Sequence, residues 1–361
     1  NVALGLNALK LNTTGHSNVA IGASALIDNT EGNYNTALGL ESLFKNTTGD
    51  GNVAFGYQSL HSSVTANYNV AIGFRAMCAT TTGKENVAVG HNTLFTNTTG
   101  ARNAAIGYQA LCSNVTGDEN VALGYETMKS NTSGQRNVAV GMNALRNNTI
   151  GQYNVSVGYD SMYNSTTGEC NTAVGNAALF SNTTGIRNTA IGYESLKANT
   201  TGHSNTAVGF KALEDNTSGQ SNTAVGFCAM CNNTTGISNT AVGVRAGMLN
   251  LYGTKNSSLG ESALQNNTVG GHNVAMGYQA LVSSAGGAWN TAVGTCALYT
   301  TLNYYNTAVG ANAGKLQGTQ SAKYNIYLGY NAGCDLTTGA GNVTIGTVQP
   351  ESNTGNRQLK I

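Results

Sequence analysis

The chain has 361 residues, of which 9% are charged, and its formal net charge is +1. Lys and Arg occur singly rather than in the basic stripe that neutralises nucleic-acid phosphates. No run of about eighteen apolar residues is present that could cross a membrane. We therefore expect neither nucleic acid nor a membrane among the partners of this protein.

From Asn1 onward the sequence is a tandem repeat with a period of 17 residues. Each unit opens with Asn-(Val/Thr)-Ala-(aliphatic)-Gly, carries Ala-Leu or Ala-Met at positions eight and nine, and closes with Asn-Thr-Thr-Gly and two variable residues. The opening asparagine recurs in steps of 17 as far as Asn290, and again at Asn306, Asn325 and Asn342. Because helix-pair repeats need longer units, this period predicts a β-solenoid with one unit per coil.

The first unit illustrates the expected path of one coil. Residues 2–4 form a strand in which Ala3 points to the opposite side from its two neighbours, because strand side chains alternate. Gly5 then turns the chain, a second short strand occupies residues 6–10, and a loop at residues 12–15 closes the coil. The sequence thus predicts an all-β fold, a parallel β-solenoid of about twenty coils with one 17-residue repeat per coil.

Two columns of identical residues are expected to stabilise the stack of coils. The asparagine at position one can bond through its amide to its copies above and below, which would satisfy buried polar groups along the stack. The glycine at position five is present in every unit, whereas the glycine at position fifteen has exceptions such as Ala66. The turn at position five therefore has the stricter requirement for glycine. The predicted structural ladder includes Asn1, Asn18, Asn35, Asn52, Asn69, Gly5, Gly22 and Gly39. An exposed row of ligand-binding amides is the alternative role of the asparagines.

The alanine column at position three suggests how copies of the chain associate. The alanines face away from the Val/Ile/Leu column, so the strand is apolar on both sides and should be covered on both sides. Positions eight and nine of the same coil would cover one side, and three copies around a common axis would cover the other. The predicted trimer contact comprises Ala3, Ala20, Ala37 and Ala54. A single-chain solenoid with a thin core is the alternative.

Candidate binding residues lie at the variable positions, which should line the outer edges of the coils. Aromatic residues recur at position seventeen, where they could stack on sugars or staple the turn. These candidates for surface binding are Tyr34, Tyr68, Tyr153 and Trp289. Threonine fills position two in successive units from Thr172 to Thr240, as an outward ice-binding face would require, but valine fills the same column in most early coils.

No catalytic or metal-binding constellation emerges from the sequence. The five histidines are scattered over the coils, no Ser-His-Asp set can be assembled, and acidic residues are too few for calcium-binding repeats. Glu41, Glu126 and Glu194 share position seven, where a solvated coil edge explains them better than paired catalytic carboxylates. We therefore expect no enzyme activity, no metal and no cofactor.

The seven cysteines are expected to be free thiols. Cys228 and Cys231 form a lone C-x-x-C motif, without the second pair that zinc requires or the helix start of a redox motif. Cys78 and Cys112 share a column but lie two coils apart, too far for a disulfide. Free thiols favour assembly in a reducing cytoplasm. The Asn-Thr-Thr triplets match the glycosylation pattern, but the repeat itself generates them, so we predict no glycans.

The period fails only near the end of the sequence. The unit from Asn290 has sixteen residues and the unit from Asn306 has nineteen, while Gly314 and Gly333 replace the leucine or methionine of position nine. These glycines remove core volume, which predicts looser or wider coils. Without a starting methionine or an obvious cap, the sequence is expected to be part of a longer protein. The expected domains are a regular solenoid at 1–305, irregular coils at 306–341 and a cap or junction at 342–361.

The repeat resembles two kinds of known arrays. Asn-Val-Ala-Ile-Gly, at 18–22 and 69–73, is similar to the head repeats of trimeric autotransporter adhesins. The full unit, Asn-Thr-Ala-Val-Gly followed by Ala-Leu and Asn-Thr-Thr-Gly, looks more like the arrays in tail fibres of bacteriophages, including cyanophages. Residues 342–361 resemble the exit from such an array into a following fibre domain. The unit is longer than the adhesin repeat, and the sequence contains neither a heptad stalk nor an anchor barrel.

This resemblance, which covers nearly the whole chain, implies a left-handed, homotrimeric solenoid. It implies a fibre shaft that projects from a virion and contacts a host-surface glycan or receptor, at the virion surface or outside the cell. A bacterial cell-surface adhesin head is the first alternative function. A single-chain ice-binding or purely structural solenoid is the second.

Overall fold

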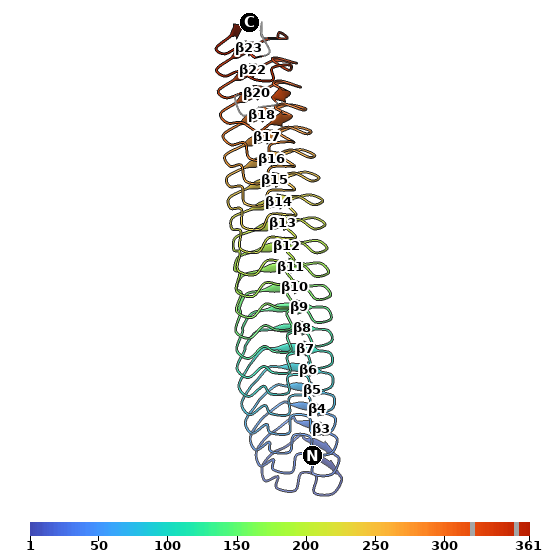
Figure 1. The fold of residues 1–361 in the computed structure, drawn as a ribbon. Coiled ribbons are helices and arrows are strands. Elements are labelled where there is room, and N and C mark those ends of the chain that lie inside the picture. The colour runs from blue at the N-terminus through green and yellow to red at the C-terminus, as the bar shows by residue number, and fades with distance from the viewer. Residues whose placement is uncertain (318–321, 350–353) are drawn as a thin grey trace. The chain divides into compact units, whose positions relative to one another are not determined.

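The computed structural model in Figure 1 describes residues 1–317, 322–349 and 354–361. The chain divides into two compact units, Asn1–Thr184 and Gly185–Ile361, which are described separately. Within the described residues every regular element is a β-strand, and no helix is present.

The first unit is a stack of short parallel strands, one in each coil. Ala20 of β2 lies directly opposite Ala37 of β3, and each later strand of this unit as far as β10 pairs in the same register with the strand 17 residues further on. The strands are β1 (Val2–Leu4), β2 (Val19–Ile21), β3 (Thr36–Leu38), β4 (Val53–Phe55), β5 (Val70–Ile72), β6 (Val87–Val89), β7 (Ala104–Ile106), β8 (Val121–Leu123), β9 (Val138–Val140), β10 (Val155–Val157) and β11 (Thr172–Val174).

The second unit continues the same pattern with its own strands. They are β12 (Thr189–Ile191), β13 (Thr206–Val208), β14 (Thr223–Val225), β15 (Thr240–Val242), β16 (Ser257–Leu259), β17 (Val274–Met276), β18 (Thr291–Val293), β19 (Thr300–Thr301), β20 (Thr307–Val309), β21 (Leu316–Gln317), β22 (Ile326–Leu328), β23 (Val343–Ile345) and β24 (Leu359–Lys360). β19 and β21 form a separate pair, and the others stack in parallel. The predicted all-β parallel solenoid, with one repeat per coil, is confirmed in both units.

The turn at position five also agrees with prediction. Gly124, at the end of β8, has φ of 140°, a conformation that L side chains rarely adopt. A Cβ added there would lie 2.5 Å from the carbonyl oxygen of Gly141 in the next coil. Position five therefore needs glycine both for its backbone conformation and for the close approach of neighbouring coils.

The segment predicted as a second strand is instead a turn. In the first coil, Asn7 and Leu9 have φ of 60° and 50°, and positions seven and nine repeat this left-handed conformation in coil after coil. Strand residues have strongly negative φ, so the prediction of a strand at residues 6–10 is wrong. The turn still bonds to the next coil, since the backbone nitrogen of Leu9 donates to the carbonyl oxygen of Ala25 at 3.0 Å. A left-handed leucine costs roughly 1–2 kcal/mol, whereas burying its side chain contributes about 1.5–3 kcal/mol. Burial therefore outweighs the backbone strain.

The core of each coil is thin, and its buried apolar columns lie at positions three, eight and nine. Position three contributes alanine from the strand, and position nine contributes leucine or methionine from the turn. Ala37 and Leu43 of one coil are both 0% exposed, as are their counterparts in the following coils. Because leucine fills most of the space inside the coil, only a small side chain fits opposite it.

The coils expected to be looser keep their interior filled by a different pair of residues. At Tyr327 of β22 a fully buried ring replaces the usual alanine of position three. A Cβ on Gly314 would lie 2.6 Å from Cδ2 of that ring, so the ring occupies the space of a leucine. The backbone nitrogen of Asn325 still donates to Oδ1 of Asn306 at 3.1 Å. The expectation that glycine leaves volume unfilled at position nine is therefore wrong at Gly314 and Gly333, which both adjoin this ring.

Parts of the predicted irregular region and junction, at 318–321 and 350–353, lie outside the described residues. On either side of 350–353, Val343 of β23 lies opposite Leu359 of β24 in parallel register. Described residues of the expected junction thus add strands to the parallel sheet. The boundaries at 305 and 341 stay predictions.

Candidate interaction surface

The asparagines of position one form a hydrogen-bonded ladder inside the coils. Oδ1 of Asn35 accepts hydrogen bonds from the backbone nitrogen (2.9 Å) and from Nδ2 (3.1 Å) of Asn52. Nδ2 of Asn52 also donates to the carbonyl oxygen of Ala66 at 2.7 Å. Asn18 and Asn69 are buried in the same column, whereas Asn1, in the first coil, is exposed. Buried rungs of this ladder present no amide to an external ligand.

The alanine column of position three lies inside the chain, which corrects the predicted location of the trimer contact. Ala20, Ala37 and Ala54 are at most 1% exposed within a single chain. Ala3 is exposed, because it lies in the first coil of the stack. Side chains already buried in their own coil cannot contact a second copy. The expected two-sided strand is real, but the side left uncovered carries the larger aliphatic residues.

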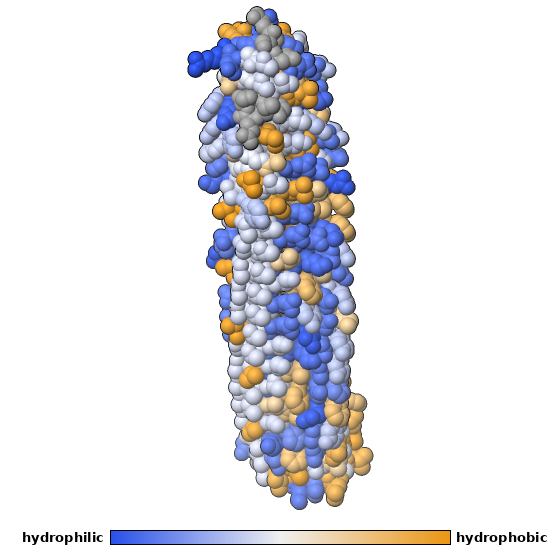
Figure 2. Space-filling view, viewed as in Figure 1, coloured by the Kyte–Doolittle hydropathy of each residue, from blue (hydrophilic) through white to orange (hydrophobic). Residues whose placement is uncertain are grey.

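Positions two and four therefore form the outer side of the sheet. In the first unit they carry valine, isoleucine and leucine that are half-buried or exposed, such as Val87, Ile106 and Leu123. Figure 2 shows apolar residues at the surface among hydrophilic ones, and they gather near the end that carries the N-terminus. This sheet face is apolar and, within one chain, uncovered.

An aromatic ladder borders this face at position six. Five consecutive coils of the first unit contribute Tyr57, Phe74, His91, Tyr108 and Tyr125. Neighbouring rings are stacked, with centroids 5.0–5.3 Å apart. In the second unit Tyr193, Phe210 and Phe227 stack in the same way, at 5.3 and 5.1 Å. The rings are exposed, with Phe74 at 44%.

The stacking decides which part of each ring is available for binding. Phe74 is flanked by Tyr57 on one side and by His91 on the other, so both of its faces are covered by neighbouring rings. Its exposed surface must therefore come mainly from the ring edge. The sequence analysis did not predict this ladder. Its signal was present in the aromatic residues of position six, because residues one period apart lie above one another in a solenoid.

The four aromatic residues predicted at position seventeen are exposed, but they do not form one site. Tyr34 and Tyr68 are each 64% exposed, and Tyr34 contacts the His16 ring edge-on at 5.3 Å. The guanidinium of Arg136 lies 5.5 Å from the centre of the Tyr153 ring and also donates a hydrogen bond to its hydroxyl.

Trp289, in the second unit, belongs to a separate stack. It lies between His272, at 3.8 Å, and Tyr305, at 6.4 Å, measured between ring centroids. Covered faces make this tryptophan a poor platform for a sugar.

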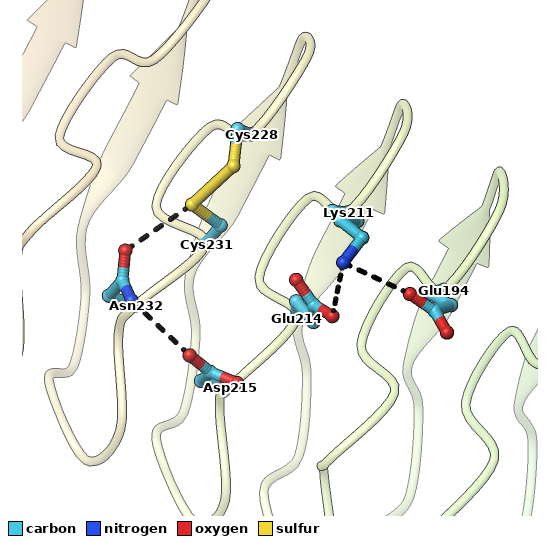
Figure 3. The surroundings of a disulfide bond; sticks show 7 residues. All are labelled: Glu194, Lys211, Glu214, Asp215, Cys228, Cys231 and Asn232. Atoms are coloured by element: carbon cyan, nitrogen blue, oxygen red, sulfur yellow. Dashed lines mark hydrogen bonds and ion pairs between the residues drawn. A yellow bond between two sulfur atoms is a disulfide. The ribbon is translucent and has the colours of Figure 1, made fainter.

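A charged column runs along positions seven and ten, which lie side by side on the outside of the turn. Glu194 accepts a hydrogen bond from Lys197 at 2.6 Å. It also pairs with Lys211 of the next coil at 3.2 Å, and Lys211 pairs in turn with Glu214 at 3.0 Å (Figure 3). The hydrogen bond from Lys197, with that from Lys211, lowers the pKa of Glu194 below its ordinary value.

Glu126 is held in the same way in the first unit. Burial raises the pKa of its carboxyl, but hydrogen bonds from Lys129 (2.7 Å) and Arg146 (2.8 Å) outweigh burial and leave the pKa below its ordinary value. These glutamates are thus ionised partners in surface ion pairs, and neither faces a second carboxylate as a catalytic pair would require.

Cys228 and Cys231 occupy positions seven and ten of one coil and are joined by a disulfide (Figure 3). Their Cα atoms are 4.9 Å apart, within the range that a disulfide spans. The prediction of free thiols is therefore wrong for this pair, because the turn brings these two positions together. Free thiols are Cys78, Cys112, Cys170, Cys296 and Cys334.

The described residues contain no group of three or more His, Cys, Asp or Glu placed to hold a metal ion, and no pocket is found among them. Within the same residues no helix has the length and apolar character needed to cross a membrane. The surface features available for recognition are therefore columns of side chains. The sequence matches no protein-family model, and no curated protein is similar enough to count as a match.

Proposed function

We propose that the chain is a structural, non-enzymatic shaft whose copies associate through the apolar face. This face comprises positions two, four and six of the coils from Val53 to Tyr125 in the first unit. The observation that carries the proposal is the exposed aromatic ladder beside two exposed aliphatic columns. Large contiguous apolar surfaces on soluble proteins usually mark interfaces.

A second copy of the chain fits this face better than a sugar does. Sugars stack on the faces of aromatic rings, and in the ladder those faces are covered by neighbouring rings. A second copy has the same spacing between coils, so its rows of side chains can meet these rows along the whole face. Each added coil then contributes further buried apolar area, at about 25 cal/mol per Å².

We place three copies around a common axis, with this outer face rather than the alanine column turned toward the axis. The trimer and a left-handed coil are supported by the resemblance of the repeat to adhesin heads. The same resemblance, in its closer form to phage fibres, supports a shaft on a virion surface or outside a cell that contacts a host-surface glycan or receptor. The exposed Tyr34 and Tyr68 are the aromatic residues best placed for that contact. A bacterial adhesin head is the alternative.

Assembly in a reducing cytoplasm stays part of the proposal. The five free cysteines support it, and the Cys228–Cys231 disulfide argues against it for that one pair.

The native mass in solution tests the association. We expect light scattering after size exclusion to give three times the chain mass of 37.0 kDa. A double variant, Phe74→Glu with Ile106→Glu, places charges on the apolar face and should give the mass of a single chain. Thr99→Glu is the matched control, because Glu31 occupies the same position fourteen in another coil. A single-chain mass for the unaltered protein would overturn the proposal.

A second candidate function, ice binding, rests on the threonine column of the second unit. Thr206 lies directly opposite Thr189 and Thr223 on the outer side of the sheet, which gives a regular row of hydroxyl and methyl groups. Thermal hysteresis in freezing solution tests this function. If it is present, Thr206→Val with Thr223→Val should reduce it without unfolding the chain, because Val70 occupies the same position in another coil.

A further inference from the structure

Acceptor triplets for N-glycosylation, Asn-x-Ser/Thr, fall at three positions of the coil. At position twelve they begin at Asn12, Asn46, Asn97, Asn114, Asn131, Asn182, Asn199, Asn216 and Asn233. At position one they begin at Asn154, Asn256 and Asn342, and at position eleven at Asn147, Asn164, Asn232 and Asn266. All of these triplets satisfy the same sequence pattern, so the structure must distinguish them.

Apart from the half-buried Asn12 of the first coil, the position-twelve acceptors are 0% exposed, and their side chains lie inside the coil. Nδ2 of Asn114 donates to Oδ1 of Asn97 at 2.9 Å and to the carbonyl oxygen of Gly117 at 3.0 Å, and Asn114 is 0% exposed. In the second unit, Nδ2 of Asn233 donates in the same way to Asn216 at 2.7 Å and to Gly236 at 3.3 Å. Both amide hydrogens are therefore engaged in a buried ladder.

The position-one amides are unavailable for sugar attachment for the same reason. Nδ2 of Asn154 donates to Oδ1 of Asn137 at 3.2 Å and to the carbonyl oxygen of Gly168 at 2.8 Å. Asn256 donates to the carbonyl oxygen of Gly270 at 2.8 Å and is 3% exposed. A sugar on either nitrogen would have to occupy the interior of the solenoid.

Position eleven is different, although it adjoins position twelve in the sequence. Asn232, the immediate neighbour of Asn233, lies on the outer edge of its coil near Asp215 and Cys231 (Figure 3). It is half-buried, and its Nδ2 donates to Oδ2 of Asp215 at a long 3.3 Å. Asn147, Asn164 and Asn266 are half-buried as well. Here a sugar can project into solvent, and the amide keeps one hydrogen for Asp215.

We propose that, beyond the first coil, the folded chain can carry N-linked glycans only at the position-eleven asparagines, and that transfer to a buried asparagine of position twelve or one prevents its coil from folding. In transfer, Nδ2 bonds to C1 of the sugar, the C1–O bond to the lipid-diphosphate donor breaks, and Nδ2 loses one proton. The modified nitrogen then has one hydrogen where the ladder requires two, and a bulky group where the next coil must pack. A chain that passes through a glycosylating compartment therefore folds only when its buried acceptors are skipped.

Secretion of the complete chain from eukaryotic cells tests the proposal. Chains are separated into a protease-resistant and an aggregated fraction, and mass spectrometry maps the glycosylated asparagines in each. We expect the resistant fraction to carry glycans only at Asn147, Asn164, Asn232 or Asn266, or at the half-buried Asn12 of the first coil. A glycan on Asn114, or on another buried acceptor, in resistant chains with an unchanged circular dichroism spectrum would overturn the proposal.

A matched variant removes the buried acceptors without altering the asparagine ladder. Position fourteen supplies the third residue of each position-twelve triplet, and Val269 shows that valine is accepted there. Substitutions such as Thr99→Val and Thr116→Val at every such triplet, with alanine for Ser156, Ser258 and Thr344, abolish the buried acceptors. We expect this variant to give several-fold more resistant chains, glycosylated at position eleven. An unchanged yield, with the parent chains glycosylated at position twelve, would contradict the proposal.

Thiol labelling measures the same accessibility without glycosylation enzymes. Asn164→Cys and Ser165→Cys place a thiol at positions eleven and twelve of one coil, and serine to cysteine is a small change at a fully buried site. In the native protein a polyethylene glycol maleimide should label Asn164→Cys at least about 100-fold faster than Ser165→Cys, above the baseline of the parent thiols. Equal labelling of the two folded variants would overturn the assignment of closed and open positions.

Discussion

The coils of the first unit and the coils after Asn306 in the second unit fill their interiors with different residues. In the first unit, a small alanine of position three lies opposite a large leucine or methionine of position nine, as with Ala37 and Leu43. After Asn306 the sizes are exchanged, and the ring of Tyr327 lies against Gly314 and Gly333. In the coil of Tyr327 the large side chain therefore comes from position three and the small residue from position nine, the reverse of the first unit.

The difference teaches that a departure from the repeat in one column can be accommodated by a departure in the column it touches. Positions twelve and fifteen give a second example. Ala66 replaces the usual glycine of position fifteen in the coil where Ser63 replaces the usual asparagine of position twelve. Elsewhere, a Cβ at position fifteen would meet the asparagine side chain, as at Gly32, where Oδ1 of Asn29 would be 2.5 Å away. Substitutions that undo one member of such a pair should therefore be costly.

Tyr327→Ala should have the largest effect on stability. The variant leaves two glycines and an alanine around a buried space, and emptying a site of an aromatic side chain costs about 3–5 kcal/mol. Chemical denaturation monitored by circular dichroism measures the loss.

The matched control returns that region to the arrangement of the first unit. Tyr327→Ala combined with Gly314→Leu should recover much of the lost stability, because leucine adopts the same left-handed conformation at position nine of other coils. Gly314→Leu alone should be destabilising, since its side chain would overlap the Tyr327 ring. Additive effects of the two substitutions would break the proposed exchange of volume.

Gly32→Ala should have the next largest effect, a loss of about 1–3 kcal/mol from overpacking. Its Cβ would lie 2.5 Å from Oδ1 of Asn29, 2.5 Å from the carbonyl oxygen of Gly49 and 2.8 Å from Nδ2 of Asn46. Adding Asn29→Ser reproduces the pairing of Ser63 with Ala66 and should reduce the cost of the alanine. The measurement is a double-mutant cycle of unfolding free energies, and a coupling energy near zero would show that Ser63 and Ala66 occur together by chance.

The sequence predicted the fold well because the repeat places equivalent residues above one another. The strand at positions two to four, the glycine turn and the asparagine ladder all follow from local chemistry at one position. The left-handed Leu9 does not, because glycine or asparagine is the usual residue in that conformation. In Leu26 and its counterparts, which have the same conformation, burial in the coil interior favours it, and burial depends on the completed fold.

The candidate surface was harder to predict, because the alternation of strand side chains does not say which set faces inward. Either position three or positions two and four could have faced the interior of the coil. Of the two faces of a strand, the one with the larger aliphatic residues usually faces the core. Here Leu26, from the turn, already fills the interior, so only the alanine of the strand fits inside. The aromatic ladder of position six was accessible from the sequence by comparing residues one period apart. The Cys228–Cys231 disulfide was not, because it depends on a turn that brings positions seven and ten together.

Ser165→Asn should stabilise the first unit by about 1 kcal/mol, the net value of a typical hydrogen bond. Ser165 interrupts the position-twelve ladder, and both its Oγ and Oδ1 of Asn148 are buried without a hydrogen-bond partner. The introduced amide can donate to Asn148 and to the carbonyl of its own coil, as Asn131 does to Asn114 and Gly134. Ser165→Ala is the control, since it removes the hydroxyl without extending the ladder. A lower denaturation midpoint for Ser165→Asn than for the parent would show that packing around Ser165 requires this interruption of the asparagine ladder.

Glu194→Gln should have the smallest effect, below about 1 kcal/mol, because ion pairs near the surface contribute little. The pKa of Glu194 is lowered in the folded chain by the hydrogen bond from Lys197 and by Lys211. A carboxyl whose folded pKa is lowered stabilises the protein above its unfolded pKa, and this contribution is lost as the pH falls through the folded pKa. Parent and variant should therefore differ in melting temperature at neutral pH and converge under acid conditions. Cys228 and Cys231 join the same two positions covalently in a nearby coil, so the ion pair of Glu194 is expected to show this pH dependence where the disulfide shows none. A difference that persists unchanged at low pH would mean that Glu194 acts through packing rather than through its charge.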